Sequence, residues 1–583
     1  MNFRHYGIKT KLVLKKLYLD VRHSHLKDLR NQILLYFKKM PDVVHLRNLI
    51  VSIVLLSIIM LVMFAQNFSA LAGYHKSQIP KRGGSYNEGV IGNIDKINPL
   101  FISNQAEASA NRLVFSGLTR VLPDNQVKED LAESWDIKED NKIYIFRLRE
   151  NVLWHDGKKF SADDVVFTFN LIQNPDVRTN RSAIWQGVVV EKLNEREIKF
   201  SLPNSYNNFL QIASEPILPQ HLFEDIDPQS IKVSEFNTAP IGTGPYKFER
   251  FDQAGNETEV VLSANSNFYL HRPYIEQVKL ILYSDFQQLY NGLLRKQIDG
   301  MTQVPFDKIT DVEQKGSFKL YQYYLPRYKV LVFNLKNASL SVKEVRKAIS
   351  DALNRKNIID ECLAGKAMEV YAPILPGKEG YDPKLRTQPQ EKTVINEALD
   401  KAGWSRNAEG IRSKDGKSLI FRAIASEDSE NSKVMGVLKD ELGEIGIKLE
   451  VTMSDPTQFQ AEYLRPRNFD IVLMGQGLGS ETDIYSFWHS SQVSDPGLNI
   501  SGFKDRKVDK LLEQIRKSND PAYRAERYQE IQKTLLAEIP TVYLYNPIYT
   551  IGISDTIKGF YTGKTTEPIN HLNNIYDWYI RTK

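Results

Sequence analysis

His155 and Asp156 are adjacent in the segment Trp154-His-Asp-Gly157, and an aspartate that orients an imidazole is a common acid–base pair. Adjacent residues on a turn point in different directions, however, and no nucleophile is evident beside them. The Asp-Gly step is typical of a tight turn. We therefore interpret the segment as a turn with Trp154 packed inward, not as a catalytic site.

Two glycine-rich segments invite a ligand-binding interpretation. Five residues separate the two glycines of Gly410–Ser418, whereas a phosphate-binding loop has four residues between them. Its Asp415-Gly416 step instead predicts a hairpin turn. The segment Gly242-Thr-Gly-Pro-Tyr246 predicts a tight turn whose backbone approaches either a ligand or another part of the chain.

Motifs of hydrolytic and metal chemistry are absent from the sequence. It contains no His-Glu-x-x-His, no Gly-x-Ser-x-Gly and no cluster of His and Cys, which zinc enzymes and serine hydrolases need. The single cysteine, Cys362, excludes an internal disulfide and a lipid anchor after an apolar leader. The sequence thus favours a binding protein without cofactor or metal over an enzyme, with an anchored extracellular hydrolase as the alternative.

The elements around these segments mix strands with helices. Residues 142–149 alternate in polarity like a half-buried strand, and Ser161 with Asp164 forms a capping signature before an apolar run. A second capping box is predicted at residues 341–344, and Asp520-Pro521 is typical of a helix start. This mixture predicts an α/β or α+β architecture.

Charge is distributed unevenly along the chain. The formal net charge is +5, of which residues 1–47 contribute +8, so the remainder carries −3. That remainder lacks the basic footprint of a nucleic-acid-binding protein. Residues 69–83 are small, polar and basic, as in a linker.

An uncharged apolar segment of 17 residues runs from Leu49 to Ala65. As a helix it spans about 25 Å, against roughly 30 Å of hydrocarbon. Its basic flank predicts a cytoplasmic N-terminus and an extracytoplasmic C-terminal domain. Ala70-Leu-Ala72 offers a cleavage pattern for a signal peptide, but the long basic arm favours a retained anchor.

Several ordered segments resemble one family, that of extracytoplasmic solute-binding proteins serving oligopeptide and dipeptide ABC importers. The strongest block is Leu131–Trp135, Tyr144–Glu150, Val152–Gly157 and Ser161–Phe169. Further matches are Gly242–Phe248, Gly292–Gly300, Val345–Ile349, Ala402–Trp404, Gly497–Gly502 and Val508-Asp509. Together they cover roughly residues 84–579.

The resemblance implies an α/β, three-lobed periplasmic-binding-protein-like fold of class II, of the large peptide-binding type, after one N-terminal transmembrane helix. The implied organisation is a cytoplasmic arm (1–47), an anchor (48–68), a linker (69–83), lobe I (84–120, 212–325 and 548–583), lobe II (121–211) and lobe III (326–547). Crossing strands are expected near 326–334 and 541–547. Two lobes would close about a hinge on a ligand.

The implied function is capture of an oligopeptide or dipeptide and its delivery to ABC permease subunits with their ATPases. The resemblance places a monomeric ectodomain outside the cell membrane, tethered by a single pass through residues 49–65. Another solute, such as an oligosaccharide, is the open alternative. No nucleic acid is expected as a partner.

Residues 469–488 depart from the peptide-specific members, which carry Gly-Trp followed shortly by Asp-Tyr, the aspartate pairing with the peptide's α-ammonium. Here Gln476 replaces the tryptophan, and Gly479 falls near the aspartate position. Glu481 or Asp483 could supply the anionic partner, and a helix start is the other interpretation of Asp483. The predicted ligand-binding residues are Asn334, Gly475, Gln476, Gly477, Gly479, Glu481, Asp483, Tyr485 and Trp488.

Overall fold

The computed structural model describes residues 28, 31, 34–35, 51–63, 80–122, 126–179, 181–203, 205–206, 208–254, 257–478, 482–518, 520–561, 563 and 567–582. The chain divides into two compact units, residues 1–79 and 80–583. In the first unit, residues 51–63 are helical and exposed. Among the described residues, none of the helices has both the length and the apolar character needed to cross a membrane. Residues 48–50 and 64–68 of the predicted anchor (48–68) lie outside the described residues.

A twelve-stranded sheet runs through the second unit in the order β20-β19-β21-β14-β22-β12-β2-β11-β10-β9, with β13 and β15 also paired to β22. Its strands are β2 (Ser85–Ile91), β9 (Tyr246–Ala254), β10 (Glu257–Ala264), β11 (Gln277–Tyr283), β12 (Gly300–Met301), β13 (Phe318–Tyr324), β14 (Arg327–Phe333), β15 (Ala367–Glu369), β19 (Ile420–Ser426), β20 (Lys448–Ser454), β21 (Ile471–Gly477) and β22 (Thr541–Ser554).

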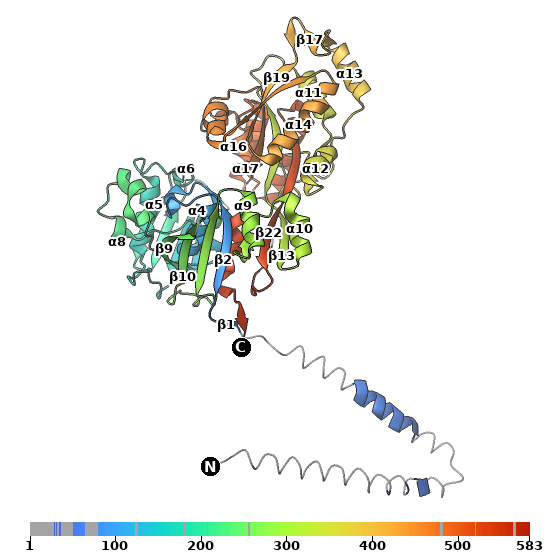
Figure 1. The fold of residues 1–583 in the computed structure, drawn as a ribbon. Helices are drawn as coiled ribbons and strands as arrows, with labels where there is room; N and C mark the ends of the chain where they lie inside the picture. Colours follow the sequence, from blue (N-terminus) through green and yellow to red (C-terminus); the bar gives the residue numbers. More distant parts are fainter. Residues whose placement is uncertain are drawn as a thin grey trace. The chain divides into compact units, whose positions relative to one another are not determined.

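The long strand β22 connects two halves of this sheet. Its first residues, Thr541–Tyr545, pair with β14, whereas Ile548–Ser554 pair with β13. Figure 1 shows β22 passing between the elements around β19 and α14 and those around β2 and β13. The connection from β13 to β14 lies at the same level of the sheet, so two chain segments join the halves there.

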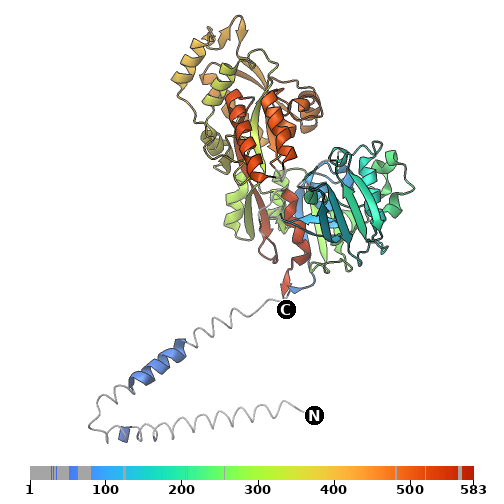
Figure 2. The same ribbon diagram turned by 180° about the vertical axis from the view of Figure 1, so that it is seen from behind.

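Around β14 the sheet is buried on both faces, because successive side chains of a strand point to opposite sides. Leu331 and Phe333 belong to one apolar core, and Val330 and Val332 to another. The first face is covered by α11 (Lys343–Ala352), α12 (Arg355–Leu363), α13 (Lys392–Lys401) and α14 (Ser429–Glu444), and the second by α17 (Arg506–Lys517) and α18 (Pro521–Glu538). Figure 2 shows the last two, coloured orange to red, lying side by side over the strands.

A separate antiparallel sheet has the order β5-β6-β8-β7. Its strands are β5 (Ala132–Lys138), β6 (Ile143–Leu148), β7 (Val189–Asn194) and β8 (Glu197–Ser201), and α5 (Ala162–Gln173) covers it. Phe146 and Phe200 of the strands meet edge to face, and Phe169 of α5 packs on Phe200. Its core is continuous with that of β2, β10 and α4 (Gln105–Val114).

Shorter elements complete the described chain. The remaining strands are β1 (Pro80–Lys81) paired with β23 (Arg581–Thr582), β3 (Thr119–Val121) with β4 (Val127–Glu129), and β16 (Ser405–Arg406), β17 (Arg412–Lys414) and β18 (Lys417–Ser418). The remaining helices are α6 (Ser182–Trp185), α7 (Phe209–Ile212), α8 (Gln220–Phe223), α9 (Phe286–Leu294), α10 (Ile309–Lys315), α15 (Pro456–Gln458), α16 (Tyr485–Trp488), η1 (Pro99–Phe101), η2 (Pro228–Val233), η3 (Glu235–Asn237), η4 (Phe306–Lys308), η5 (Phe459–Leu464), η6 (Ser490–Gln492) and η7 (Pro568–Asp577).

The helix caps test the local predictions. The Ser161–Asp164 capping box is confirmed at α5, and Asp520 caps α18 as predicted. The capping box predicted at residues 341–344 is wrong. The Ser341 hydroxyl donates to the backbone oxygen of Ala338 (2.8 Å), and α11 begins only at Lys343 without a side-chain cap. The Ser341 hydroxyl is thus bonded within the turn before α11 and does not cap the helix.

Candidate functional site

The Trp154–Gly157 turn contacts the predicted glycine-rich turn. The backbone N–H of Gly242 donates to Nδ1 of His155 (3.2 Å), and Nε2 donates to the backbone oxygen of Gly244 (3.1 Å). Burial lowers the pKa of His155 to about 4. Trp154 is buried, as predicted. The neutral imidazole thus holds the Trp154–Gly157 turn against the Gly242–Tyr246 turn, which is a structural role.

The glycines of this turn are required by close packing against the end of α4. A Cβ on Gly242 would lie 1.9 Å from the backbone oxygen of Val114, and one on Gly244 would lie 2.6 Å from that of Leu113. Of the two possibilities that the sequence left open, approach to another segment is the one observed. The Asp415-Gly416 turn likewise connects β17 to β18, as predicted.

An unpaired strand edge is present at the end of β21. In its antiparallel pairing with β14, the N–H of Leu478 bonds Pro326 and the C=O of Asp470 accepts from Asn334. Alternation along an antiparallel ladder therefore directs the backbone groups of Gly475 and Gly477 away from β14. On that other side β19 pairs with β21 only as far as Leu473.

Gly475 and Gly477 are exposed, and nothing described lies within 4 Å of a Cβ built on either of them. Between them Gln476 points to the opposite face, where it is buried and its Nε2 finds no partner among the described residues. The end of β21 thus offers free backbone donors and acceptors with no side chain in front of them. An extended ligand can pair with such an edge.

A charged network lies on the glycine face of the sheet. Lys329 pairs with Gly475 across the ladder, and its Nζ lies 2.7 Å from Oδ1 of Asn431 and 3.0 Å from the Glu430 carboxylate. The hydroxyl of Tyr545 donates to the same carboxylate (2.8 Å). Glu430 and Asn431 lie in the first turn of α14. Both signs of charge are therefore held close to the free edge.

Arg327 pairs with Gly477 and lies beside the other half of the sheet. Its guanidinium is 5.5 Å from the ring centre of Tyr549, a cation–π distance. The Tyr549 hydroxyl donates to the backbone oxygen of Thr302 and accepts from Gln105 (2.9 Å). No carboxylate of the described chain forms an ion pair with Arg327, whose buried Nε has no partner there.

Sequence reasoning missed Arg327, Lys329, Glu430 and Tyr545. A signal for the first two was present, because they occupy alternate positions at the start of an otherwise apolar strand. Charge at alternate positions marks one face of a strand as polar. Glu430 and Tyr545 carry no comparable local signal.

The predicted residue Asn334 lies at the far end of β14. Its Nδ2 donates to the backbone oxygens of Phe469 (2.8 Å) and Arg467 (3.2 Å), and its Oδ1 accepts from the N–H of Lys336 (3.1 Å). All of these bonds stabilise the turn after β14. The structure does not bring Asn334 to the free edge of β21.

The other predicted residues gather at α16. Asp483 accepts from the N–H of Tyr485 (3.0 Å) and pairs with Arg516 (2.5 Å), which lies 3.7 Å from the Tyr485 ring centre. Trp488 is buried in the core on the face opposite to the glycines. The structure thus favours the helix-start interpretation of Asp483. Gly479 and Glu481 lie outside the described residues.

Comparison with known proteins decides the family. The family described as bacterial extracellular solute-binding proteins, family 5, matches residues 126–496. This match covers more than half of the chain. The chain belongs to that family.

Two solved structures have the same fold as this family 5 protein over most of its length. The oligopeptide-binding protein AppA from Bacillus subtilis, in complex with a nonapeptide, superposes with a TM-score of 0.74 at 27% identity over 86% of this chain and 100% of its own. NikZ from Campylobacter jejuni, in complex with Ni(L-His), gives 0.73 at 28%, covering 85% of this chain and 99% of its own. The periplasmic-binding-protein-like α/β fold is thereby confirmed.

Curated relatives of this family 5 protein include two whose names state a peptide ligand. AppA from Bacillus subtilis is 28% identical over 86% of this chain and 92% of its own length. The probable D,D-dipeptide-binding periplasmic protein DdpA from Escherichia coli is 24% identical over 77% of this chain and 85% of its own. The family is one of solute-binding proteins, in agreement with the prediction of a binding protein.

Proposed function

We propose that this family 5 protein captures an oligopeptide or dipeptide outside the cytoplasm and delivers it to the permease of an ABC importer. The observation that carries this proposal is the free edge of β21 at Gly475 and Gly477. An extended peptide pairs with such an edge through its own backbone, so affinity does not depend on reading every side chain. The names of AppA and DdpA agree with a peptide ligand.

The charges beside the edge suit the two ends of a peptide. Glu430 offers a carboxylate for an ammonium group, and Arg327 offers a guanidinium with no carboxylate partner in the described chain. A guanidinium binds a carboxylate through two parallel hydrogen bonds. Of the residues predicted from sequence, Gly475 and Gly477 belong to this proposed site, and Asp483 and Tyr485 stay as flanking candidates. Gln476 and Trp488 are buried on the opposite face of the sheet.

Delivery requires that the ligand be enclosed and then released. We place the hinge where the β13–β14 connection and β22 join the two halves of the sheet, which agrees with the crossing strands expected near 326–334 and 541–547. Lobe I (84–120, 212–325 and 548–583), lobe II (121–211) and lobe III (326–547) are the bodies proposed to move. Lys433 of α14 already lies 5.3 Å from the Phe306 ring centre across this junction.

The proposed location is the outer face of the cell membrane. The apolar segment 49–65 would span the bilayer with the basic arm 1–47 in the cytoplasm, because positive flanks stay inside. A tether keeps the local concentration of the binding protein high at its permease. Removal of residues 1–72 should abolish membrane association and leave ligand affinity unchanged.

A non-peptide ligand is the second candidate. NikZ, whose structure holds Ni(L-His), is as similar to this chain as AppA is, at 28% and 27% identity. Similarity at this level therefore favours a metal chelate as much as a peptide. The charged pair Lys329–Glu430 suits a zwitterionic ligand of either kind.

The full chain, purified in detergent, can be tested for ligand by native mass spectrometry followed by calorimetric titration. We expect a co-purified mass in the peptide range and stoichiometric binding of peptides from two to nine residues. Replacing the backbone amides of the peptide by N-methyl groups should remove most of the affinity, because the edge then loses its partners. Binding of Ni(L-His) without any peptide binding would overturn the proposal.

A further inference from the structure

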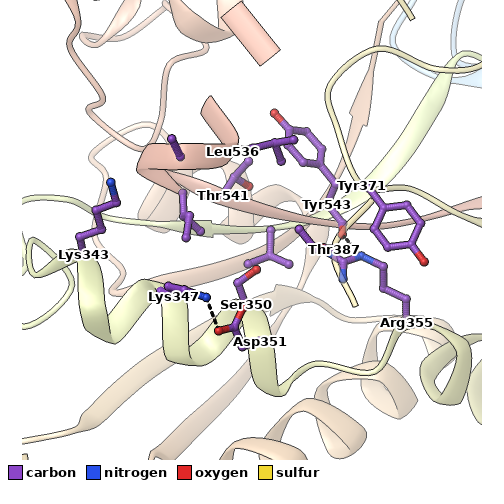
Figure 3. Close-up of a pocket in the computed structure, with 13 residues that line it drawn as sticks. Lys343, Lys347, Ser350, Asp351, Arg355, Tyr371, Thr387, Leu536, Thr541 and Tyr543 are labelled. Atoms are coloured by element: carbon purple, nitrogen blue, oxygen red, sulfur yellow. Dashed lines mark hydrogen bonds and ion pairs between the residues drawn. The ribbon is translucent and has the colours of Figure 1, made fainter. Parts of the chain in front are cut away.

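A cavity of about 360 Å³ lies apart from the free edge of β21, between α11, the end of α18 and the start of β22. The chain around Tyr371 and Thr387 closes its remaining side, and Arg355 at the start of α12 contributes to its wall. Figure 3 shows the Arg355 side chain ending beside Thr387 and Tyr543. Cavities of roughly 300–1,000 Å³ are typical of small-molecule sites.

Arg355 is the unusual group in this cavity. It is only 4% exposed, and its Nε donates to the backbone oxygens of Tyr543 (2.7 Å) and Val370 (3.0 Å). Its two terminal nitrogens have no acceptor in the described part of the chain, although the ring centre of Tyr371 is 4.7 Å away. The guanidinium is therefore held rigidly from one side and is free on the other.

A neighbouring arginine shows what a fully structural role looks like. Arg346 on α11 is also buried, at 5% exposed, but all three of its nitrogens donate to backbone oxygens. Those acceptors belong to Leu340, Ser341, Glu538 and Ile539. Arg346 thus uses all of its nitrogens in bonds to the backbone, whereas Arg355 uses only its Nε among the described residues.

The other charged groups around the cavity are already paired. Lys347 bonds Asp351 (2.5 Å) and Lys343 bonds Glu538 (3.1 Å), all of them partly exposed. Glu369 accepts from the Tyr371 hydroxyl. In contrast, the buried Oγ1 of Thr387 has no partner among the described residues. Arg355 and Thr387 are hence two buried cavity-lining donors still available to a ligand, and the Ser350 hydroxyl lines the same cavity.

The charge of Arg355 persists at neutral pH. Burial lowers its pKa to about 10, opposed by Tyr371 and Glu369. A buried charge is costly unless it is paired and hydrogen-bonded. An oxoanion would supply both the opposite charge and the acceptors for the terminal nitrogens.

We propose that this cavity is a second ligand site, which binds the carboxylate of a small organic acid through Arg355 and Thr387. The cavity is far larger than the roughly 30 Å³ that one water occupies in the liquid, so an organic acid fits it better than a free inorganic anion. The site is independent of the proposed peptide site, because it is built from α11, α12 and α18 and not from β21.

The test is calorimetric titration of the full chain with succinate, citrate and inorganic phosphate, each against chloride at matched ionic strength. We expect saturable binding of an organic acid. Arg355→Met should weaken it at least about tenfold, the lower bound for a hydrogen bond to a charged group. Lys356→Met is the matched control, because it removes an adjacent exposed charge that pairs with Asp360 and does not line the cavity, and it should bind as the unaltered chain does.

If Arg355→Met does not fold, Thr387→Val tests the same site. It removes only the unpartnered hydroxyl, so it should weaken binding several-fold without lowering the melting temperature. Saturation by phosphate alone, with the same dependence on both residues, would assign the site to a free ion. Absence of saturable binding by all three probes, or equal binding by both variants and the unaltered chain, would overturn the proposal.

Discussion

Asn546 of β22 donates from its side-chain amide to the backbone oxygen of Leu325 (2.9 Å), and so joins the two chain segments that connect the halves of the sheet. Asn546 is only 1% exposed. The next residue, Pro326, accepts from the N–H of Leu478 (2.8 Å). The end of β21 is thus bonded directly to the connection about which we propose the lobes to move.

Asn546→Ala should destabilise the protein by about 0.5–1.5 kcal/mol, because the oxygen of Leu325 would lose one of its two donors and keep only the N–H of Arg327 (2.7 Å). Urea unfolding measures this change. Asn194→Ala is the control, since the Asn194 amide donates to Glu197 (2.8 Å) and its Oδ1 accepts from the N–H of Arg196 (2.9 Å), but on an exposed surface. If both variants lost the same free energy of unfolding, burial of the Asn546 bond at the junction would not contribute to stability.

Gly477→Val should weaken peptide binding at least about tenfold and change the free energy of unfolding by no more than about 0.5 kcal/mol. A Cβ at this position meets no described atom within 4 Å, and a β-branched residue suits a strand. Its methyl groups would instead occupy the glycine face of the sheet directly beside the free edge, where the side chains of a bound ligand would lie. Calorimetry and a thermal melt measure the two effects.

Gly244→Val is the contrasting variant. Its Cβ would lie 2.6 Å from the backbone oxygen of Leu113, so we expect loss of folding and not a selective loss of binding. If Gly477→Val also failed to fold, Gly477 would have a structural role. If it bound peptide normally, the free edge would not be the ligand site.

Asp483→Asn should leave peptide affinity within about twofold of the unaltered value. The carboxylate already pairs with Arg516 and caps Tyr485, and an exposed ion pair of this kind contributes about 0–1 kcal/mol to stability. Titration with free and N-acetylated forms of one peptide measures the effect. If Asp483→Asn weakened binding of the peptide with a free N-terminus but not of the N-acetylated peptide, Asp483 would instead be the partner of the peptide ammonium.

His155 should make the protein less stable in mild acid. Its pKa is about 4 when folded and about 6.5 when unfolded, so between these values the unfolded chain binds a proton that the folded chain does not. The resulting stability is present above pH 6.5 and is lost as pH falls toward 4, by up to about 3 kcal/mol. Lys247 and Asp156 are the charged groups that act on the imidazole.

His155→Gln tests this assignment, because glutamine retains a donor for Gly244 but does not titrate in this range. Urea unfolding between pH 4 and 7.5 measures the free energy of unfolding at each pH. This free energy should rise less steeply with pH for the variant than for the unaltered chain. Identical slopes would place the acid sensitivity elsewhere in the molecule.

Features that depend on neighbouring residues could be predicted from the sequence. The strand at residues 143–148, the cap at Ser161, the helix start at Asp520 and the turn at Asp415-Gly416 all occur as expected. Each depends on side-chain alternation or on bonds within four residues. The cap expected at Ser341 failed because a tighter turn, also local, competed for the same hydroxyl.

The sequence by itself determined the family, the α/β fold class and which short segments form strands, helices and turns, since these depend on local bonding and on ordered motifs. It also pointed to Gly475 and Gly477, through the resemblance. Only the tertiary structure decided that their backbone groups are free, because that depends on the register with β14 and on where β19 ends, some 50 residues earlier in the chain. Asn334 and Asp483 show the same dependence: each has bonds that only the folded chain supplies.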